Sequence, residues 1–230
     1  MLEISNLSAC YGESRMLHQL DLHVGDGDIV CLIGRNGVGK STTLKSIMGL
    51  VNTPEGSIRL GDREMRKLET YDRAKSGIGY VPQGRDIFPQ MTVEENLQLG
   101  LWPAGGRGKI PDYIYDLFPS ISQFAKRKGG DLSGGQQQQL AIARALAAEP
   151  RILILDEPTE GIQPSIIQDI GNAIKKINEW KGISVLIVEQ YLDFVLGISD
   201  YIYLMEKGSI ILEGKTGELD AAEIQRRMTE

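Results

Sequence analysis

The 230-residue sequence has little cysteine and histidine, and it has no long apolar run. Its two cysteines, Cys10 and Cys31, lack the spacing of a metal site or a disulfide framework, so we expect reduced thiols. The two histidines, His18 and His23, fall in a predicted N-terminal hairpin region, where we expect surface or packing roles rather than catalysis. No apolar run reaches the roughly 18 residues that a membrane-spanning helix needs.

An excess of basic residues is absent too. The chain has 31 acidic and 25 basic residues and a formal net charge of -6. General binding to nucleic acid or anionic lipid needs a basic surface, so this balance argues against both. Residues 1–12 contain no basic region followed by an apolar stretch, so we expect no secretory leader. The sequence therefore predicts a protein that stays in the cytoplasm.

A glycine-rich loop follows a short apolar run near the N-terminus. Residues 29–33 (IVCLI) have the character of a buried parallel strand, and residues 34–42 read GRNGVGKST. The spacing matches the phosphate loop G-x-x-x-x-G-K-[ST], whose glycines let backbone N–H groups approach an anion. Helical residues continue to Gly49, so the loop opens a helix whose N-terminus favours negative charge. The alternative, a glycine-rich turn with a surface lysine, does not explain the order of strand, loop and helix.

The loop residues are candidates for nucleotide binding. Lys40 is predicted to neutralise the β- and γ-phosphates of ATP, and the Ser41 hydroxyl is predicted to ligate Mg2+. The other candidates, whose backbone would surround the phosphates, are Gly34, Arg35, Asn36, Gly37, Val38, Gly39 and Thr42.

Two carboxylates follow a second apolar run, residues 152–155 (ILIL). Asp156 and Glu157 come directly after this predicted strand, at the strand end where open α/β sheets bind ligands. Asp156 is placed to hold Mg2+, and Glu157 is placed to polarise the water that attacks the γ-phosphate. An acidic strand cap before Pro158 is the alternative, and the phosphate loop in the same chain favours the catalytic interpretation.

A second glycine-rich helix start lies in residues 132–136 (LSGGQ), here called the signature segment. Ser133 is a predicted N-cap with Gly134 and Gly135 in the first turn, and apolar residues continue the helix until Pro150. An ordinary N-capped helix with a flexible glycine lead is the alternative. Because the chain already has a complete phosphate loop, we interpret this second anion site as serving a second molecule.

The remaining pattern predicts an α/β fold with a mainly parallel sheet covered on both faces. Alternation at Leu20, Leu22 and Val24, followed by residues 29–33 and 56–60, predicts a mixed sheet at the start and an antiparallel β-subdomain there. Thr92 and Glu95 form a predicted capping box. Further strands are predicted at 78–81, 152–155, 185–188 and 201–205, and a long helix is predicted with Ile166, Ile167, Ile170, Ala173, Ile174 and Ile177 on one face.

An inserted helical subdomain is indicated between two parts of this core. Residues 105–130 contain a glycine-rich stretch, an aromatic helix around Tyr113 and a basic connector. We predict one domain over residues 1–230, with a nucleotide-binding core in 1–83 and 151–230 and the helical subdomain in about 84–150.

In chain order, these motifs resemble those of ATP-binding cassette (ABC) ATPases. The order is Tyr11, GRNGVGKST, Gln83 in YVPQG, LSGGQ and ILILDEPT, and it covers essentially the whole chain. In that family two cassettes pack head to tail, so that ATP on one phosphate loop is capped by the other chain's signature segment. The resemblance implies adenine stacking by Tyr11, contact of Gln83 with Mg2+ and the attacking water, and a general-base role for Glu157. It also implies contact with the partner's γ-phosphate by Ser133, Gly134, Gly135 and Gln136.

One position departs from the family pattern. Where many cassettes place a histidine that contacts the γ-phosphate, this sequence has Gln190 in VEQYLDF. Glutamine donates a hydrogen bond but carries no positive charge, so its switch role is open. VEQ, together with Gln163 and Pro164, resembles cassettes of importers for branched-chain amino acids, urea and short-chain amides, most closely the urea-importer cassette.

The resemblance implies partners that this chain does not contain. They are a second cassette, either identical or different, two membrane permeases and, indirectly, a solute-binding protein, which place the cassette on the inner face of the membrane. Residues 84–91 (GRDIFPQM) carry Ile87, Phe88 and Met91 where a loop should be polar, and with the helix after Thr92 they are a candidate docking site for a permease. Packing of Phe88 under the helical subdomain is the alternative.

Two other function classes stay open at this point. A soluble cassette ATPase acting on DNA or ribosomes is disfavoured by the acidic balance, the single cassette and the missing coiled-coil insertion. A small-molecule phosphotransferase would use the phosphate loop alone and leaves the signature segment unexplained. A transporter motor accounts for both anion sites.

Overall fold

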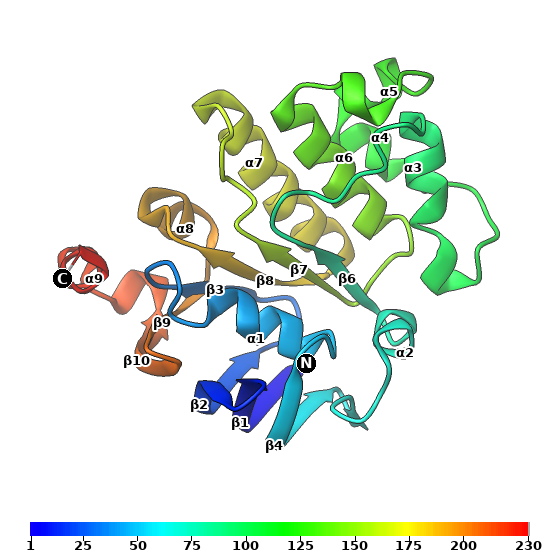
Figure 1. Ribbon diagram of the computed structural model, residues 1–230. Helices are drawn as coiled ribbons and strands as arrows, with labels where there is room; N and C mark the ends of the chain where they lie inside the picture. The colour runs from blue at the N-terminus through cyan, green and yellow to red at the C-terminus, as the bar shows by residue number, and fades with distance from the viewer. Residues whose placement is uncertain (230) are drawn as a thin grey trace.

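Two β-sheets organise the chain, and the computed structural model describes residues 1–229 (Figure 1). Sheet A is antiparallel, in the order β2-β1-β4-β5, and sheet B is mostly parallel, in the order β10-β9-β3-β8-β7-β6. Only β10, which pairs antiparallel with β9, departs from the parallel direction in sheet B. The strands are β1 (Leu2–Tyr11), β2 (Ser14–Val24), β3 (Ile29–Ile33), β4 (Asn52–Leu60), β5 (Arg63–Glu64), β6 (Ile78–Val81), β7 (Ile152–Asp156), β8 (Ser184–Glu189), β9 (Tyr201–Glu206) and β10 (Ser209–Lys215).

Helices lie on both faces of sheet B. In Figure 1, α3 to α7 lie above this sheet, while α1 and sheet A lie below it. The helices are α1 (Lys40–Ile47), α2 (Thr70–Lys75), α3 (Val93–Leu99), α4 (Tyr113–Leu117), α5 (Pro119–Gln123), α6 (Gly134–Leu146), α7 (Pro164–Lys181), α8 (Leu192–Ile198) and α9 (Ala221–Thr229). Three 3-10 turns complete the set: η1 (Trp102–Ala104), η2 (Gly129–Asp131) and η3 (Thr216–Glu218). No helix within residues 1–229 is long and apolar enough to cross a bilayer.

Strand β3 is the centre of both cores. Its residues Ile29, Cys31 and Ile33 pack into the core under α6 and α7, and Val30 and Leu32 pack on the other face toward α1 and sheet A. Every residue of β3 is buried, as a central parallel strand requires. Each fully buried Ile or Leu side chain contributes roughly 1.5–3 kcal/mol, so this strand anchors the loop that follows it.

The predicted fold class is confirmed, and one detail of it is wrong. Strands β2 and β4 join β1 in the antiparallel sheet, whereas residues 29–33 do not begin a mixed sheet with them but lie between β8 and β9 in sheet B. The reason is burial: β2 alternates between buried and exposed residues, and β3 is buried on both sides. A five-residue apolar strand has no stable place in a sheet with one solvated face.

The segment between β6 and β7 is built mainly from helices. Helix α3 begins with the predicted capping box, in which Glu95 N donates to Thr92 Oγ1 (3.2 Å) and Thr92 N donates to Glu95 Oε2 (2.7 Å). The aromatic segment forms α4, and the signature segment leads into α6. The division into a core and a helical subdomain stays a prediction.

Candidate nucleotide site

The phosphate loop connects the end of β3 to the start of α1. Gly34 and Gly39 have φ angles of 153° and 118°, which glycine adopts without strain. A Cβ atom on Gly34 would lie 2.5 Å from the carbonyl oxygen of Met205, so no other residue fits there. The loop therefore presents backbone N–H groups at the N-terminus of α1, which is the geometry of an anion cradle.

Lys40 is buried at the start of α1. Its Nζ donates to the carbonyl oxygens of Gly34 (2.7 Å) and Arg35 (3.0 Å), and it lies 3.5 Å from Oε1 of Glu157. Burial lowers the pKa of Lys40 below its usual value, and the charge of Glu157 opposes that shift. The ammonium group is thus held beside the loop where the phosphates of a nucleotide would lie.

Two carboxylates from the end of β7 face this loop. Ser41 Oγ donates to Asp156 Oδ1 at 2.9 Å, which joins two of the three predicted Mg2+ ligands. Burial raises the pKa of Asp156, and the hydrogen bond from Ser41 opposes the shift. Burial also raises the pKa of Glu157, and Lys40 opposes it, so this carboxylate is a stronger base than an exposed one. Glu157 has a φ of 48°, a strained conformation that recurs at functional sites.

Gln83 reaches the same place from the end of β6. Its Nε2 donates to Glu157 Oε2 (3.3 Å) and to Glu160 Oε2 (3.0 Å). Gln83 lines a cavity of about 250 Å³ together with Lys40, Ser41 and Glu157. Its lining residues are Met16, Asn36, Gly37, Gly39, Lys40, Ser41, Thr42, Gln83 and Glu157.

The donor set suits Mg2+ better than a metal held by protein alone. Ser41, Asp156 and Gln83 offer a hydroxyl, a carboxylate and an amide oxygen, and Mg2+ typically takes one or two carboxylates together with phosphate oxygens. Within residues 1–229, no group of three or more His, Cys, Asp and Glu residues is arranged to hold a metal ion. The three donors from Ser41, Asp156 and Gln83 fit an ion that completes its coordination with phosphate oxygens.

The signature segment lies apart from this cavity. Ser133 caps α6 in a capping box with Gln136, in which Ser133 N donates to Gln136 Oε1 (3.0 Å) and Gln136 N donates to Ser133 Oγ (3.4 Å). A Cβ atom on Gly135 would lie 2.7 Å from Ile166 Cγ2, so glycine allows α6 to pack on α7. None of residues 133–136 lines the cavity at the phosphate loop. A single chain does not complete its own site with its own signature segment.

Besides the signature segment, the predicted site residues that do not line this cavity are Tyr11, Gly34, Arg35, Val38, Asp156 and Gln190. Tyr11 ends β1 with 47% of its surface exposed, and Gln190 is exposed directly after β8. The histidines are exposed on β2, outside the site. The sequence did not single out Met16, which lines the cavity, or Glu160 and Glu189, which contact site residues. Two of them had a sequence signal: Glu160 lies three residues after Glu157, and Glu189 lies in the VEQ motif.

A phosphate loop after a central parallel strand, with a carboxylate at the end of β7 that reaches it across β8, defines a P-loop nucleoside triphosphatase. The family model described as ABC transporter matches residues 17–160. The chain therefore belongs to the ABC transporter family, and it is an ATPase of that family.

Named relatives and a solved structure agree with this assignment. The high-affinity branched-chain amino acid transport ATP-binding protein BraG of Pseudomonas aeruginosa is 38% identical over 92% of this chain and 91% of its own length. The lipopolysaccharide export system ATP-binding protein LptB of Haemophilus influenzae is 34% identical over 93% of this chain and 90% of its own length. A dimeric ATP-binding cassette in a post-hydrolysis state, bound to ADP and Pi, is similar with a TM-score of 0.83 and 28% identity, covering 94% of this chain and 99% of that one.

Proposed function

We propose that this chain is the ATP-hydrolysing cassette of a membrane importer, and that it works as a dimer whose two sites are each shared between chains. The proposal rests on the observation that the phosphate loop and the signature segment lie apart in one chain. The phosphate loop cavity is lined by Lys40, Ser41, Gln83 and Glu157 but by no signature residue. A second cassette, packed head to tail, supplies Ser133, Gly134, Gly135 and Gln136 to the γ-phosphate.

The site residues divide the work as follows. Lys40 and the backbone of the phosphate loop bind the β- and γ-phosphates, and Tyr11 stacks on the adenine. Ser41, Asp156 and Gln83 would hold Mg2+, which would neutralise charge that develops on the phosphate oxygens. Glu157 accepts the proton of the attacking water, and Gln190 donates a hydrogen bond to the γ-phosphate from the end of β8. The loss of that phosphate removes the bridge between the two chains.

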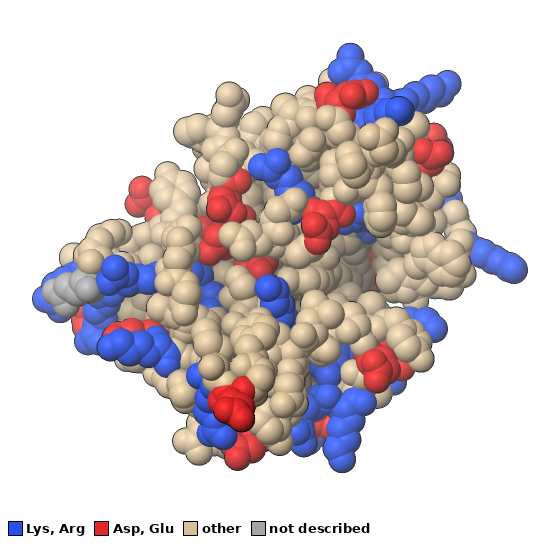
Figure 2. All heavy atoms as spheres, in the orientation of Figure 1, with Lys and Arg blue, Asp and Glu red and all other residues tan. Residues whose placement is uncertain are grey.

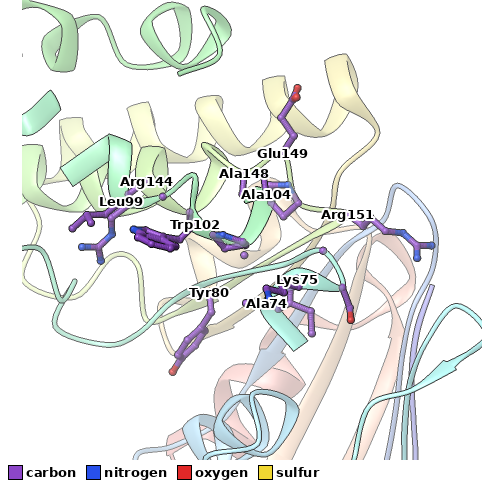
Figure 3. Close-up of a pocket in the computed structure, with 18 of the residues that line it drawn as sticks. Ala74, Lys75, Tyr80, Leu99, Trp102, Ala104, Arg144, Ala148, Glu149 and Arg151 are labelled. Atoms are coloured by element: carbon purple, nitrogen blue, oxygen red, sulfur yellow. The ribbon is translucent and has the colours of Figure 1, made fainter. Parts of the chain in front are cut away.

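The membrane subunit docks in a groove beside the loop that follows Gln83. This docking groove, of about 650 Å³, has Trp102 and Arg144 on one wall and Tyr80 and Ala74 on the other (Figure 3). Phe88, which also lines it, is 47% exposed, so packing under the helices does not account for this side chain. A groove with large exposed aromatic residues beside a catalytic loop suits an apolar segment of a partner.

The contact of Arg144 with Phe88 supports the docking proposal. Arg144 Nη2 donates to the carbonyl oxygen of Asp86 (2.7 Å), and its guanidinium lies 5.3 Å from the ring of Phe88. The guanidinium of Arg144 and the ring of Phe88 therefore lie together at the groove, where a docked segment would contact them.

The transported solute belongs to the group named by the resemblance. BraG favours a branched-chain amino acid, whereas the VEQ motif and Gln163-Pro164 resemble the urea-importer cassette. Lipopolysaccharide export is a second candidate, because LptB covers this chain to a similar extent. Uptake of labelled leucine and urea by cells lacking the gene, with and without the restored chain, separates these solutes. A Glu157→Gln chain is the matched control, and unchanged uptake of both solutes would leave a short-chain amide or export as the remaining candidates.

The partners and the place in the cell follow from the same proposal. A second cassette and two permeases hold the chain at the inner face of the membrane, and a solute-binding protein acts through the permeases. On the face shown in Figure 2, acidic and basic side chains are interspersed. This surface and the net charge of -6 support protein partners rather than nucleic acid. Purified chain should hydrolyse MgATP weakly, and reconstitution with its permeases should stimulate it; equal rates in both conditions would contradict the coupling.

A further inference from the structure

Glu189 is a buried carboxylate that contacts two loops of the site. It is the last residue of β8 and is 1% exposed. Its Oε1 accepts hydrogen bonds from Thr159 N (3.0 Å) and Thr159 Oγ1 (2.7 Å), while its Oε2 accepts from Gln190 N (2.9 Å) and Tyr191 N (3.2 Å). One oxygen thus holds the loop after β7, and the other holds the loop after β8.

The arrangement is costly unless all its contacts are made. Within residues 1–229, Glu189 makes no ion pair with a basic side chain, so neutral donors alone satisfy its two oxygens. Burial of an ionised carboxylate costs several kcal/mol, and hydrogen bonds to both oxygens offset that cost. An apolar residue at the end of β8 would close the core without this cost but would hold neither loop.

The two loops carry the groups proposed to act on the γ-phosphate. Thr159 follows Glu157 by two residues, and Glu157 N donates to Val188 O (2.9 Å), so the catalytic carboxylate is fixed to β8 on both sides. Gln190 is the residue after Glu189, and its N–H is one of the four donors. Glu157 has a φ of 48°, a strained backbone that persists only when its surroundings hold it.

We infer that Glu189 is a positioning residue that holds Glu157 and Gln190 in one fixed relation, so that the attacking water and the γ-phosphate are engaged together. It acts through these two residues and does not itself reach the cavity. The inference rests on the proposed function, because it concerns the same shared site. A displacement of about 1 Å in a catalytic group costs on the order of 100-fold in rate, so loss of this contact should slow hydrolysis without weakening ATP binding.

Glu189→Gln is the direct test. Glutamine has one accepting oxygen, so its amide N–H groups would face the N–H donors of one loop and release that loop. We expect kcat to fall about 10- to 100-fold, with KM for MgATP changed less than about 3-fold, because the phosphate loop is untouched. We also expect an ATP-bound dimer to accumulate, as it should in Glu157→Gln, since both variants are slow after binding.

Two substitutions at Thr159 test the same contact with less risk of misfolding. Thr159→Val removes one hydrogen bond and should lower kcat less than Glu189→Gln, while Thr159→Ser keeps the hydroxyl and should restore the wild-type rate. Circular dichroism and thermal melts check that each variant is folded. A folded Glu189→Gln chain with wild-type kcat would overturn the inference, and so would parallel losses of ATP affinity and kcat, which indicate general damage.

The failure of this inference is distinguishable from failure of the proposed function. If Glu157→Gln forms the ATP-dependent dimer and Glu189→Gln does not, the positioning role is wrong and the shared site stands. If all three chains, wild type, Glu157→Gln and Glu189→Gln, stay monomeric with saturating MgATP, the shared-site proposal itself fails.

Discussion

Helices α1 and α6 each have glycines at or beside their first turn, and they differ in the surroundings of the polar residue at the N-terminus. At α1, Lys40 is buried among contacts with Gly34, Arg35 and Glu157, and Gln83 and Glu157 line the cavity beside it. At α6, Ser133 is exposed and its capping box is satisfied within one turn. The phosphate loop before α1 can hold a ligand within the chain, whereas the signature segment presents the N-terminus of α6 to the solvent. The difference is what a shared site requires.

The largest effect should come from removing Glu157, the proposed general base at the phosphate-loop cavity. Glu157→Gln should lower kcat by roughly 100- to 10,000-fold, because the attacking water loses its proton acceptor, while ATP still binds. Size-exclusion chromatography with and without MgATP should show a trapped dimer. A variant that stays monomeric with saturating MgATP, while wild type dimerises, would contradict the claim that each site is shared between two chains.

Lys40→Ala should act one step earlier, on binding itself. Hydrogen bonds to charged groups contribute about 1.5–3 kcal/mol each, so loss of this ammonium group should weaken nucleotide affinity on the order of 100-fold. Equilibrium titration with a fluorescent ATP analogue measures the change. An unchanged affinity would mean that the loop backbone alone holds the phosphates.

Phe88→Asp should separate the nucleotide site from the docking groove. A charge placed in the groove should weaken assembly with the membrane subunits by about 30-fold or more, since a central aromatic residue of an interface often contributes at least 2 kcal/mol. ATP affinity should be intact, because Phe88 does not line the nucleotide cavity. Copurification with the permeases reports assembly, and Tyr71→Asp, on another exposed aromatic residue outside the groove lining, is a matched control. Unchanged assembly would refute the docking role.

The smallest effect should come from matched changes at two capping boxes. Ser133→Ala and Thr92→Ala each remove a side-chain N-cap, so each should lower the free energy of unfolding by about 1 kcal/mol. Only Ser133→Ala should also reduce turnover, by about 10-fold or more, because only Ser133 would contact a phosphate in the partner's site. Denaturant melts and ATPase assays on both variants measure this, and equal turnover in the two would remove the functional difference between the helices.

The strands that could be predicted from the sequence are those whose two faces are both buried. Residues 29–33 and 78–81 match β3 and β6 because short apolar runs buried on both faces leave little ambiguity. Strand β1 was not predicted: its pairing with β2 shifts register between Ile4 and Leu7 and again between Leu7 and Ala9, and Asn6 has a φ of 49°. These irregularities interrupt the alternation on which a strand prediction depends.

The site was predictable where a spacing encodes it. The phosphate loop, Asp156 and Glu157 lie together as local motifs indicated. Glu189 stood in the quoted VEQ motif without a role, because its contact with Thr159 joins residues 30 positions apart. That contact depends on the register of β7 with β8, in which Asp156 lies opposite Val188, and no spacing within either motif contains it.

Mixing two inactive chains tests the shared site most directly. One chain carries Lys40→Ala and keeps its signature segment, and the other carries Ser133→Arg with Gly134→Arg and keeps its phosphate loop. Each should be inactive alone, and the mixture should recover ATPase activity, because a mixed dimer contains one complete site. A mixture that stays inactive while mixed dimers form would contradict the account, as would full activity of the signature variant alone.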